Sequence, residues 1–359
     1  MLSSIYLDGF KSFVDQTLPL GQLTVLTGLN NSGKSSVMQA MRMCLSVASD
    51  DGPYLPGYGG YSELKSRLTK PNHPITICVE KPDGRYKLVF EEGRYSIPEV
   101  TDLPTTQFLS ADRFGPMVEL AVMGENEEHI GVGQKGEFAA HFVSIIEEAL
   151  VADSMQHPAS ESATLKHQLP AWMNEVAPGI KLEFHIQKRS DSSRVEVNGN
   201  RATNSGFGIS YTLPVLLALL SMTTSAAPKN AEPHVQQWFK RLSENGGLLL
   251  IENPEAHLHP RGQTAIGKLL VAAAAFGLQV VVETHSDHLL DGIRLAMKAH
   301  EKIKEGDIRI LYFTKSKEET TEVAEIQLSK NGRLSAWPEG FFDQMSKNLR
   351  ELSSAPRIS

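Results

Sequence analysis

Cysteine is scarce in this chain, with only Cys44 and Cys78 among its 359 residues. The two lie far apart in sequence without the spacing of a metal site, which excludes a disulfide scaffold and favours a reduced, intracellular protein. Long apolar runs are absent as well, because the most apolar stretch, 213–222, covers at most half a membrane span. The amino terminus meets a charge at Asp8 and a glycine at Gly9, so we expect no signal peptide. These absences predict a cytoplasmic protein without a membrane segment.

An excess of basic residues is also missing. The net charge is −7 and the isoelectric point is near 6.0, so a DNA contact would have to come from a local patch. Internal repeats and sustained heptads are absent, which excludes a solenoid and an extended coiled coil. With 41% hydrophobic and 21% charged residues, the chain is an ordinary globular protein with one large domain or two modest ones.

The first third of the chain has the pattern of strands with one helix. Apolar runs containing β-branched residues predict strands at 1–13 and 20–27. A helical pattern follows from Ser35. Further on, Asp-Gly and Glu-Gly turns separate short strands that we expect to form a small antiparallel meander, at 75–80, 86–90 and 94–97.

The stretch 116–204 differs in texture, and we interpret it as an inserted subdomain. It predicts an amphipathic helix at 137–155 and a strand pair at 181–200. Mixed α/β texture then returns, and apolar runs predict strands at 248–251, 279–283 and 308–313.

A glycine-rich segment, GLNNSGKSS from Gly28 to Ser36, fits the pattern G-x-x-x-x-G-K-[ST]. Gly28 and Gly33 permit backbone conformations that let N–H groups converge on phosphate oxygens. Lys34 would place a positive charge against the β- and γ-phosphates, and the Ser35 hydroxyl would join a magnesium shell. Because a strand precedes the segment and a helix follows it, a chance glycine-rich turn is the weaker explanation.

A second motif, LLLIENPEAHLHP, ends an apolar strand in an acid. The run from Leu248 to Ile251 delivers Glu252 to the edge where magnesium needs an oxygen ligand. One alternative is a capped turn, in which Pro254 starts a helix and Glu255 lies in its first turn. Another is a zinc site built from nearby nitrogen and oxygen ligands, namely His257, His259, Glu283, His285, Asp287 and His288.

Two further segments complete a set of four. VVVETHSDHLL, 280–290, ends a strand with His285, which can report a γ-phosphate. NSGFGISYTLPVLLALL, 204–220, opens an apolar helix with two glycines and Ser210. Free N–H groups and a hydroxyl at a positive helix end suit an anion, which a second subunit could supply. Taken alone, this segment is also consistent with a glycine-rich turn before a buried helix.

Along the chain the four motifs follow one another as phosphate loop, signature, acidic strand and switch histidine, and in this order they resemble those of ABC-type ATPases. The stretch IYLDGFKSFVDQTLPLGQLTVLTGLNNSGKSS resembles the branch that contains the chromosome-maintenance (SMC) and recombination-repair (RecF) ATPases. IENPEAHLHP and ETHSDHLL resemble compact ATPases related to the overcoming-lysogenization-defect (OLD) family. WPEGFFDQ, 337–344, resembles a carboxyl-terminal element of a subgroup of these compact ATPases.

The resemblance implies an α/β fold of the P-loop NTPase class: an ABC-type ATPase head with an antiparallel β subdomain and an inserted helical/β subdomain. The expected division is an ATPase lobe at 1–115, the insert at 116–204, a second lobe at 205–315 and a tail element at 316–359. We expect no room for the metal nuclease domain of the OLD enzymes, because fewer than fifty residues follow the strand at 308–313.

The resemblance also assigns roles by position. Phosphate and magnesium would be held by Gly28, Asn31, Gly33, Lys34, Ser35 and Ser36. Magnesium would also be bound by the acid Glu252 and sensed by Gln107, and His285 would be the switch. The signature that presses on the partner's γ-phosphate would be formed by Gly206, Gly208 and Ser210, with His259 in a loop that faces the partner. The implied assembly is a head-to-tail homodimer with two ATP molecules at its interface.

Two positions depart from the ABC-type pattern. Asn253 stands where the catalytic glutamate is usual, and an amide can orient water but cannot accept its proton at neutral pH. Either Glu255 or Glu252 assists, or turnover is slow. Tyr211 replaces a glutamine that commonly follows the signature serine.

Three functions follow as hypotheses. The first is an ATP-hydrolysing, dimerising switch that controls a separate effector, a nuclease or a toxin, in DNA repair or anti-phage defence. The second is a nucleotide sensor with negligible turnover, and the third is a metallohydrolase that uses the histidine cluster. A basic patch in the insert suggests DNA contact, although interleaved acids also fit a solvated hairpin; its cations are Lys181, Lys188, Arg189, Arg194 and Arg201.

Overall fold

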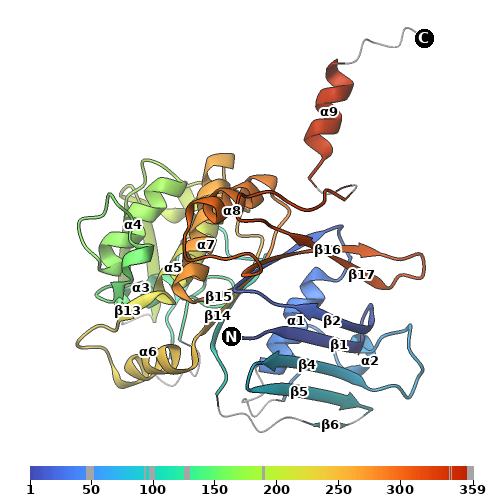
Figure 1. Ribbon diagram of the computed structural model, residues 1–359. Helices are drawn as coiled ribbons and strands as arrows, with labels where there is room; N and C mark the ends of the chain where they lie inside the picture. The colour runs from blue at the N-terminus through green and yellow to red at the C-terminus, as the bar shows by residue number, and fades with distance from the viewer. Residues whose placement is uncertain are drawn as a thin grey trace.

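A six-stranded sheet forms the centre of the computed structural model (Figure 1), which describes residues 1–45, 52–92, 94–96, 102–124, 130–187, 191–338, 340 and 342–353. In spatial order its strands are β17 (Thr321–Gln327), β16 (Ile308–Lys315), β3 (Leu23–Gly28), β15 (Gln279–Glu283), β14 (Gly247–Glu252) and β7 (Thr105–Leu109). All neighbours are parallel except β17. The carboxyl ends of β3, β15, β14 and β7 therefore meet at one edge, which is where open α/β sheets bind ligands.

Alternating residues of these strands enter two separate cores. Val25 belongs to a core on the face of α5 (Phe207–Ser221), α7 (Pro260–Phe276) and α8 (Asp287–Ala299), whereas Leu26 belongs to the core of the opposite face. The second core is shared with α1 (Lys34–Leu45) and the amino-terminal strands. This division follows from the two-residue period of a strand, and it explains why the strands are nearly continuous apolar runs.

A five-stranded antiparallel sheet covers the α1 side. Its order is β2 (Phe13–Pro19), β1 (Ser4–Phe10), β4 (Ile75–Lys81), β5 (Gly84–Glu91) and β6 (Arg94–Ser96), with the short helix α2 (Tyr61–Leu64) between β2 and β4 in the chain. The meander is confirmed, although residue 97 lies outside the described residues. The strand predicted at 1–13 is confirmed as β1 but ends at Phe10, because a tight turn with Lys11 at φ 50° separates β1 from β2.

The inserted region packs against the other face. It contains β8 (Leu120–Ala121), α3 (Ala139–Ile146), β9 (Leu150–Val151), a 3-10 turn (Asp153–Met155), α4 (Leu165–Val176), β10 (Leu182–Gln187), β11 (Ser192–Val197), β12 (Asn200–Arg201) and a second 3-10 turn (Ala202–Asn204). The strand pair at 181–200 is confirmed. The helix predicted at 137–155 is shorter, because backbone bonds from Val151 to Ala163 and from Leu165 to Ala149 hold the chain extended there.

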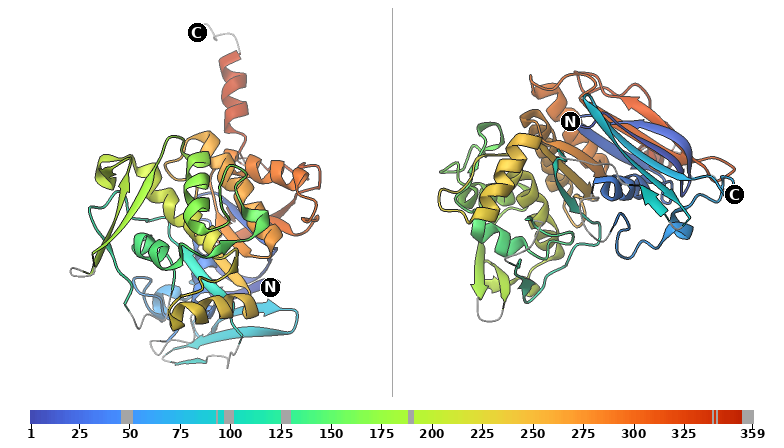
Figure 2. Two further views of the ribbon diagram at one scale, coloured as in Figure 1. Left: turned by 90° about the vertical axis from the view of Figure 1, so that its left-hand side faces the viewer. Right: turned by 90° about the horizontal axis from the view of Figure 1, so that it is seen from below.

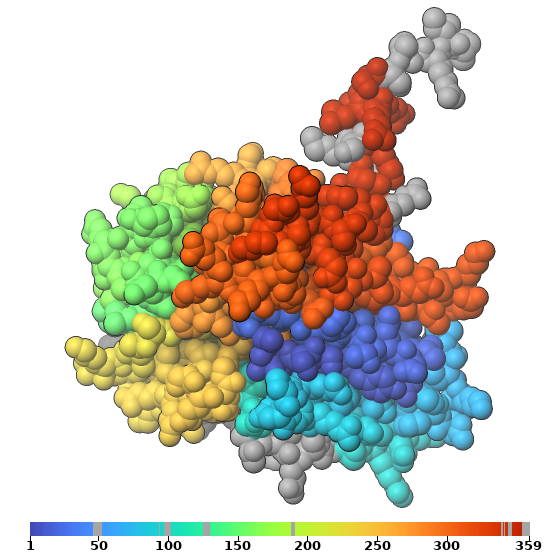
Figure 3. Space-filling model, in the orientation of Figure 1, coloured from blue at the N-terminus to red at the C-terminus, as the bar shows by residue number. Residues whose placement is uncertain are grey.

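Three helices were not anticipated, the short α2, α4 and α6 (Pro233–Asn245); α6 follows the short strand β13 (Thr224–Ala226). The last helix, α9 (Gln344–Ser353), stands away from the body of the molecule in Figure 1 and in the left-hand view of Figure 2, and the space-filling view of Figure 3 shows the same. Within the described ranges, every helix is too short or too polar to cross a bilayer.

Candidate nucleotide site

The phosphate loop connects β3 to α1 and is held by close backbone packing. Gly28 has φ 130°, and a Cβ there would lie 2.2 Å from the carbonyl oxygen of Phe313 on β16. Gly33 has φ 107° and Asn31 has φ 60°, so the loop uses left-handed conformations that glycine and asparagine tolerate. Ser36 lies in the first turn of the helix that follows. The loop predicted from the motif is present.

Lys34 and Ser35 both contact one carboxylate, that of Glu283. The Ser35 hydroxyl donates to Glu283 Oε2 at 2.9 Å, and Lys34 Nζ lies 3.8 Å from Glu283 Oε1. Lys34 Nζ also donates to the carbonyl of Leu29 at 2.7 Å, and burial lowers the pKa of its ammonium group. Glu283 therefore balances the charge of the lysine that the motif assigns to phosphate. It also accepts a hydrogen bond from the hydroxyl that the motif assigns to magnesium.

Two acids stand side by side at the ends of β14 and β15. Glu252 and Glu283 are directly paired in the parallel register, and Glu252 Oε2 accepts a hydrogen bond from Ala111 N at 2.9 Å. Burial raises the pKa of Glu283, and the nearby Glu252 and Glu255 raise it further, whereas Ser35 and Lys34 lower it. This set of carboxylate and hydroxyl oxygens is the donor set that Mg²⁺ prefers.

Asn253 and Glu255 form the turn after β14. Asn253 has φ 44°, its N–H donates to the carbonyl of Glu283, and its Oδ1 is buried without a partner among the described residues. Glu255 is 8% exposed, its Oε1 accepts from His285 N at 2.8 Å, and its Oε2 is likewise without a partner there. Burial is the main cause that raises the pKa of Glu255. Two unsatisfied oxygens at this turn suit water.

His285 follows β15 and borders the phosphate loop. Its Nε2 lies 3.9 Å from Glu283 Oε1, and burial together with the charge of Lys34 lowers the pKa of the imidazole. A pocket beside it is lined by Thr27, Gly28, Leu29 and Tyr312, and by Gly340, Phe342 and Asp343 of the carboxyl-terminal segment. The WPEGFFDQ motif therefore reaches the phosphate loop, although its Glu339 and Phe341 lie outside the described residues.

The signature residues open α5 next to the turn after β14. A Cβ on Gly208 would lie 2.8 Å from the carbonyl oxygen of His257, so only glycine permits this approach. Gly206 is the extended residue before the helix, and Ser210 lines an apolar pocket with Leu213 and others rather than the pocket at the phosphate loop. His259 precedes α7 as its N-cap.

Arg113 is a site residue that sequence reasoning missed. It is 2% exposed, and its guanidinium donates to the carbonyls of Ser110 at 2.8 Å, Glu252 at 2.7 Å and Asn253 at 2.6 Å. It thus ties the loop after β7 to the turn after β14. A signal was available, because the polar sequence SADR follows an apolar strand just as Glu252 does.

Gln107 is not placed to sense magnesium. It lies two residues before the end of β7 and pairs with Leu249, and its side chain shares a face with Leu109, in the core away from α1. Gln107 is 7% exposed, and its side chain packs against Gly131. A Cβ added to Gly131 would lie 3.0 Å from Cδ of Gln107. The assignment of Gln107 is therefore corrected, because the period of the strand turns it into the core.

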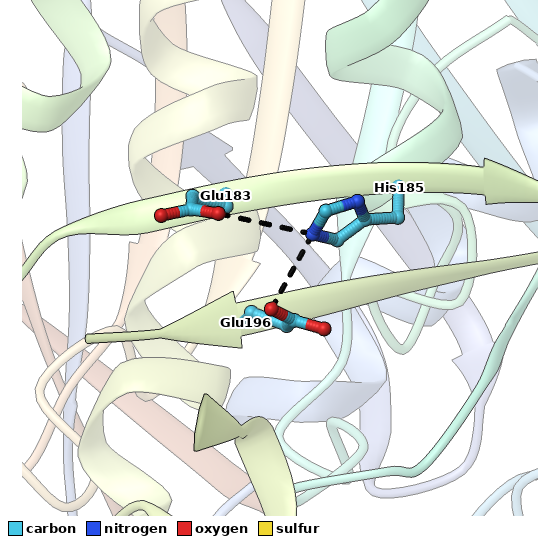
Figure 4. A group of neighbouring side chains, drawn as sticks. All are labelled: Glu183, His185 and Glu196. Carbon is cyan, nitrogen blue, oxygen red and sulfur yellow. Dashed lines mark ion pairs between the residues drawn. The ribbon is translucent and has the colours of Figure 1, made fainter. Parts of the chain in front are cut away.

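The histidine cluster does not form a metal site. Among the described residues, the only group of three with ligand atoms within 4.8 Å of one another is Glu183, His185 and Glu196 on the β10–β11 hairpin (Figure 4). His185 Nε2 lies 3.5 Å from Glu196 and 4.0 Å from Glu183, and Arg194 pairs with Glu196 at 3.2 Å. The cluster is thus a set of ion pairs that includes one cation of the predicted DNA patch; Lys188 and Arg189 lie outside the described residues.

Parts of the chain match three known protein families, and one curated protein is similar to it. Residues 1–96 match the model of the AAA ATPase domain family, and 150–291 match that of "AAA domain, putative AbiEii toxin, Type IV TA system". Residues 303–352 match "Protein of unknown function (DUF3696)". The Old nuclease of Escherichia phage P2 is 19% identical over 355 residues, which cover 80% of this chain and 57% of that protein. Two separate parts of the chain thus match AAA-type ATPase domain families, and most of the chain is weakly similar to the Old nuclease.

Solved structures similar to this chain include two SMC heads and RecF. The SMC head bound to the C-winged helix domain of ScpA has a TM-score of 0.48 at 14% identity and covers 92% of this chain and 98% of its own. The SMC head domain from Thermotoga maritima has a TM-score of 0.43 at 14% identity, with coverages of 90% and 98%. RecF with ATP has a TM-score of 0.42 at 14% identity, with coverages of 80% and 94%.

Proposed function

We propose that this chain binds and slowly hydrolyses ATP, and that ATP closes two copies into a head-to-tail homodimer. The observation that supports the proposal best is the convergence of Lys34, Ser35, Glu252, Glu283 and His285 at the carboxyl ends of adjacent strands. Because those residues come from two strands, from the loop after β15 and from the start of α1, chance placement of so many phosphate and metal ligands is a poor explanation.

The residues at this edge of the sheet would have different roles in binding and hydrolysis of ATP. Lys34 and the loop N–H groups would hold the triphosphate, and Ser35 and Glu252 would hold Mg²⁺, which neutralises charge on the transferring phosphoryl group. Glu283 contacts Lys34 and Ser35 and would either join the metal or yield to the phosphate. His285, whose pKa burial lowers, is neutral at neutral pH and offers a hydrogen bond to a γ-phosphate.

Glu255 is our candidate for the proton acceptor. Asn253 cannot take a proton, but its partnerless Oδ1 can orient a water molecule. Glu255 has one free, buried oxygen and a raised pKa, as a base that operates near neutral pH requires. The alternative is a nucleotide sensor with negligible turnover, which the asparagine favours.

Steady-state phosphate release separates these two functions. For an ATPase whose base is Glu255, Glu255→Gln lowers the turnover by about a hundredfold, whereas Asn253→Ala lowers it by about tenfold. ATP binding, measured at equilibrium, is retained in both variants. A parent protein whose phosphate release matches the background would leave only the sensor.

The dimer is tested by complementation between two inactive chains. Lys34→Ala removes the phosphate loop lysine, and Ser210→Arg blocks the signature tip. Each variant alone is expected to stay monomeric with ATP, but their mixture forms one composite site, so an ATP-dependent heterodimer is recovered. Sedimentation with and without ATP reports the assembly, and recovery that fails although both variants fold would contradict the sandwich.

The downstream role is a separate proposal. The match to a domain described as a putative AbiEii toxin, and the similarity to the Old nuclease, support a switch that controls a nuclease or toxin in DNA repair or anti-phage defence. The chain spans 57% of the length of the Old nuclease, and we propose that it controls an effector rather than acting as one. Co-purification with and without ATP identifies that partner. DNA contact through Lys181, Arg194 and Arg201 is tested by the salt dependence of binding.

A further inference from the structure

Arg113 contacts the signature helix as well as the turn after β14. Its guanidinium carbon lies 5.3 Å from the ring centroid of Tyr211, which directly follows Ser210 on α5. Burial lowers the pKa of Arg113 to about 10, so the group stays charged at neutral pH and retains its attraction to the ring face. One side chain thus connects the backbone of Glu252 and Asn253 to the first turn of the signature helix.

A second contact joins the same two elements. The Tyr211 and His257 rings meet edge to face, with centroids 4.5 Å apart and an interplanar angle of 68°. His257 lies in the same turn as Asn253 and Glu255 and has φ 62°, and its carbonyl oxygen faces Gly208. Phe207 also lies 5.4 Å from the His257 ring, and 54% of it is exposed at the helix tip. The helix tip therefore packs directly against this turn.

In the proposed head-to-tail sandwich, on which this inference rests, each signature tip serves the partner's nucleotide. The turn with Asn253 and Glu255 serves the chain's own nucleotide. We propose that Arg113 and Tyr211 are positioning residues that couple the two: engagement of a chain's signature tip by the partner's nucleotide aligns the catalytic turn of the same chain. Hydrolysis at one site then depends on occupation of the other.

The chemistry of the proposed coupling explains why an arginine stands at position 113 and a tyrosine at position 211. Three carbonyl oxygens from two loops require several donors in one plane, which a guanidinium supplies and an ammonium does not. Tyr211 replaces the glutamine expected after the signature serine, and an aromatic ring at that position gives the arginine and His257 a surface on which to pack. The tyrosine that departs from the ABC-type pattern is therefore accounted for by its contacts with Arg113 and His257.

The experiment compares ATP dependence of turnover in single variants of the full chain. Tyr211→Leu removes the ring, and Arg113→Lys keeps the charge but not the planar fork. Both are expected to bind ATP within about threefold of the parent, to lose about tenfold in kcat, and to show a Hill coefficient that falls to 1. Tyr211→Phe keeps the ring and is expected to retain the parental Hill coefficient.

Arg42→Gln is the matched control. Arg42 is also buried, at 7% exposed, and its guanidinium carbon lies 3.8 Å from the Phe108 ring centroid, while its Nη2 donates to Gln134. Its loss tests whether removing any stacked, buried arginine abolishes cooperativity, and we expect the Hill coefficient to persist. Thermal denaturation of every variant separates lost coupling from lost folding.

The outcomes distinguish the two proposals. A parent that neither dimerises nor hydrolyses ATP overturns the proposed function. A parent that does both cooperatively, with Tyr211→Leu and Arg113→Lys equally cooperative, overturns only the coupling. The coupling is also overturned if Tyr211→Phe loses cooperativity as Tyr211→Leu does, because the ring would then not be the coupling element.

Discussion

Two parts of the molecule gather glutamates, a histidine and cations, yet they differ in burial and in origin. At the nucleotide edge, Lys34 is 4% exposed and meets Glu283 from a position 249 residues away in the chain. On the hairpin, His185 and Glu183 have side chains 38% and 61% exposed, and their partners are neighbours on adjacent strands. Residue types alone do not separate the two groups.

The difference shows what makes such a group functional. Burial raises the pKa of Glu255 and Glu283 and lowers that of Lys34. The charged forms of these side chains are therefore destabilised in the empty site, and a bound ligand of opposite charge would stabilise them. The hairpin side chains are more exposed than those of the nucleotide edge, and their charges are compensated by their nearest neighbours, so we expect less to be gained there by binding. Matched substitutions in the two groups test this contrast, and the largest effect is expected at the nucleotide edge.

Lys34→Ala should weaken ATP binding by at least about a hundredfold, because it removes the buried cation that faces the phosphates. Arg194→Ala is the matched change on the hairpin, and it should leave the ATP dissociation constant unchanged. Equilibrium binding of a fluorescent ATP analogue measures both. Parental affinity in Lys34→Ala would remove the phosphate loop from the site.

Glu252→Gln should lower the turnover by about a hundredfold while ATP still binds, because an amide is a poorer magnesium ligand than a carboxylate. The magnesium concentration required for half-maximal turnover should also rise. Glu183→Gln, the corresponding change on the hairpin, should alter neither quantity. A magnesium titration of phosphate release is the measurement, and equal curves for Glu252→Gln and the parent would exclude Glu252 as a ligand.

The pH profile of turnover should have an acidic limb that belongs to Glu255. Its pKa lies above the ordinary 4.5, and a base acts only when ionised, so kcat should fall as the pH is lowered through this raised value. His285, whose pKa is lowered from 6.5, should add no limb near neutral pH. The residual turnover of Glu255→Gln should lack the acidic limb, and a limb that survives the substitution would belong to another group.

Much of the nucleotide site could be predicted from the sequence because its parts are short and local. The phosphate loop, the acid after β14 and the histidine after β15 each follow an apolar strand, and parallel strands bring such ends together. Glu283 carried the same signal as Glu252 but was assigned only to the alternative zinc site. Its contacts with Lys34 and Ser35 required knowing that β15 lies between β3 and β14.

The errors come from contacts that periodicity does not record. Gln107 was assigned by residue type, but its position inside β7 points it into the core. The helix at 137–155 was too long because long-range backbone bonds fix Val151 in a strand. Arg113 was missed although the polar sequence SADR follows an apolar strand, because its carbonyl partners after β14 cannot be read from the sequence. The boundaries at 115, 204 and 315 stay predictions.

Glu255→Gln should stabilise the nucleotide-free protein at neutral pH, by about 1 kcal/mol. The folded-state pKa of Glu255 is raised, so its contribution to stability is present below pH 4.5 and is lost as the pH rises toward the raised value. Glutamine removes the buried charge and keeps an oxygen that can accept from His285 N. Melting temperatures measured against pH should fall less steeply in Glu255→Gln, and parallel curves would mean that the carboxylate is not strained.

The smallest effect is expected on the hairpin, where Glu183 directly faces Glu196 in the register. Glu183→Gln removes one of two like charges, so it should change the free energy of unfolding by less than about 0.5 kcal/mol. Added Zn²⁺ should not raise the melting temperature, because Arg194 already occupies one oxygen of Glu196. If Zn²⁺ raised it by several degrees and Glu183→Gln removed the gain, the hairpin would be a metal site, and solvent exposure would not be what distinguishes the two groups.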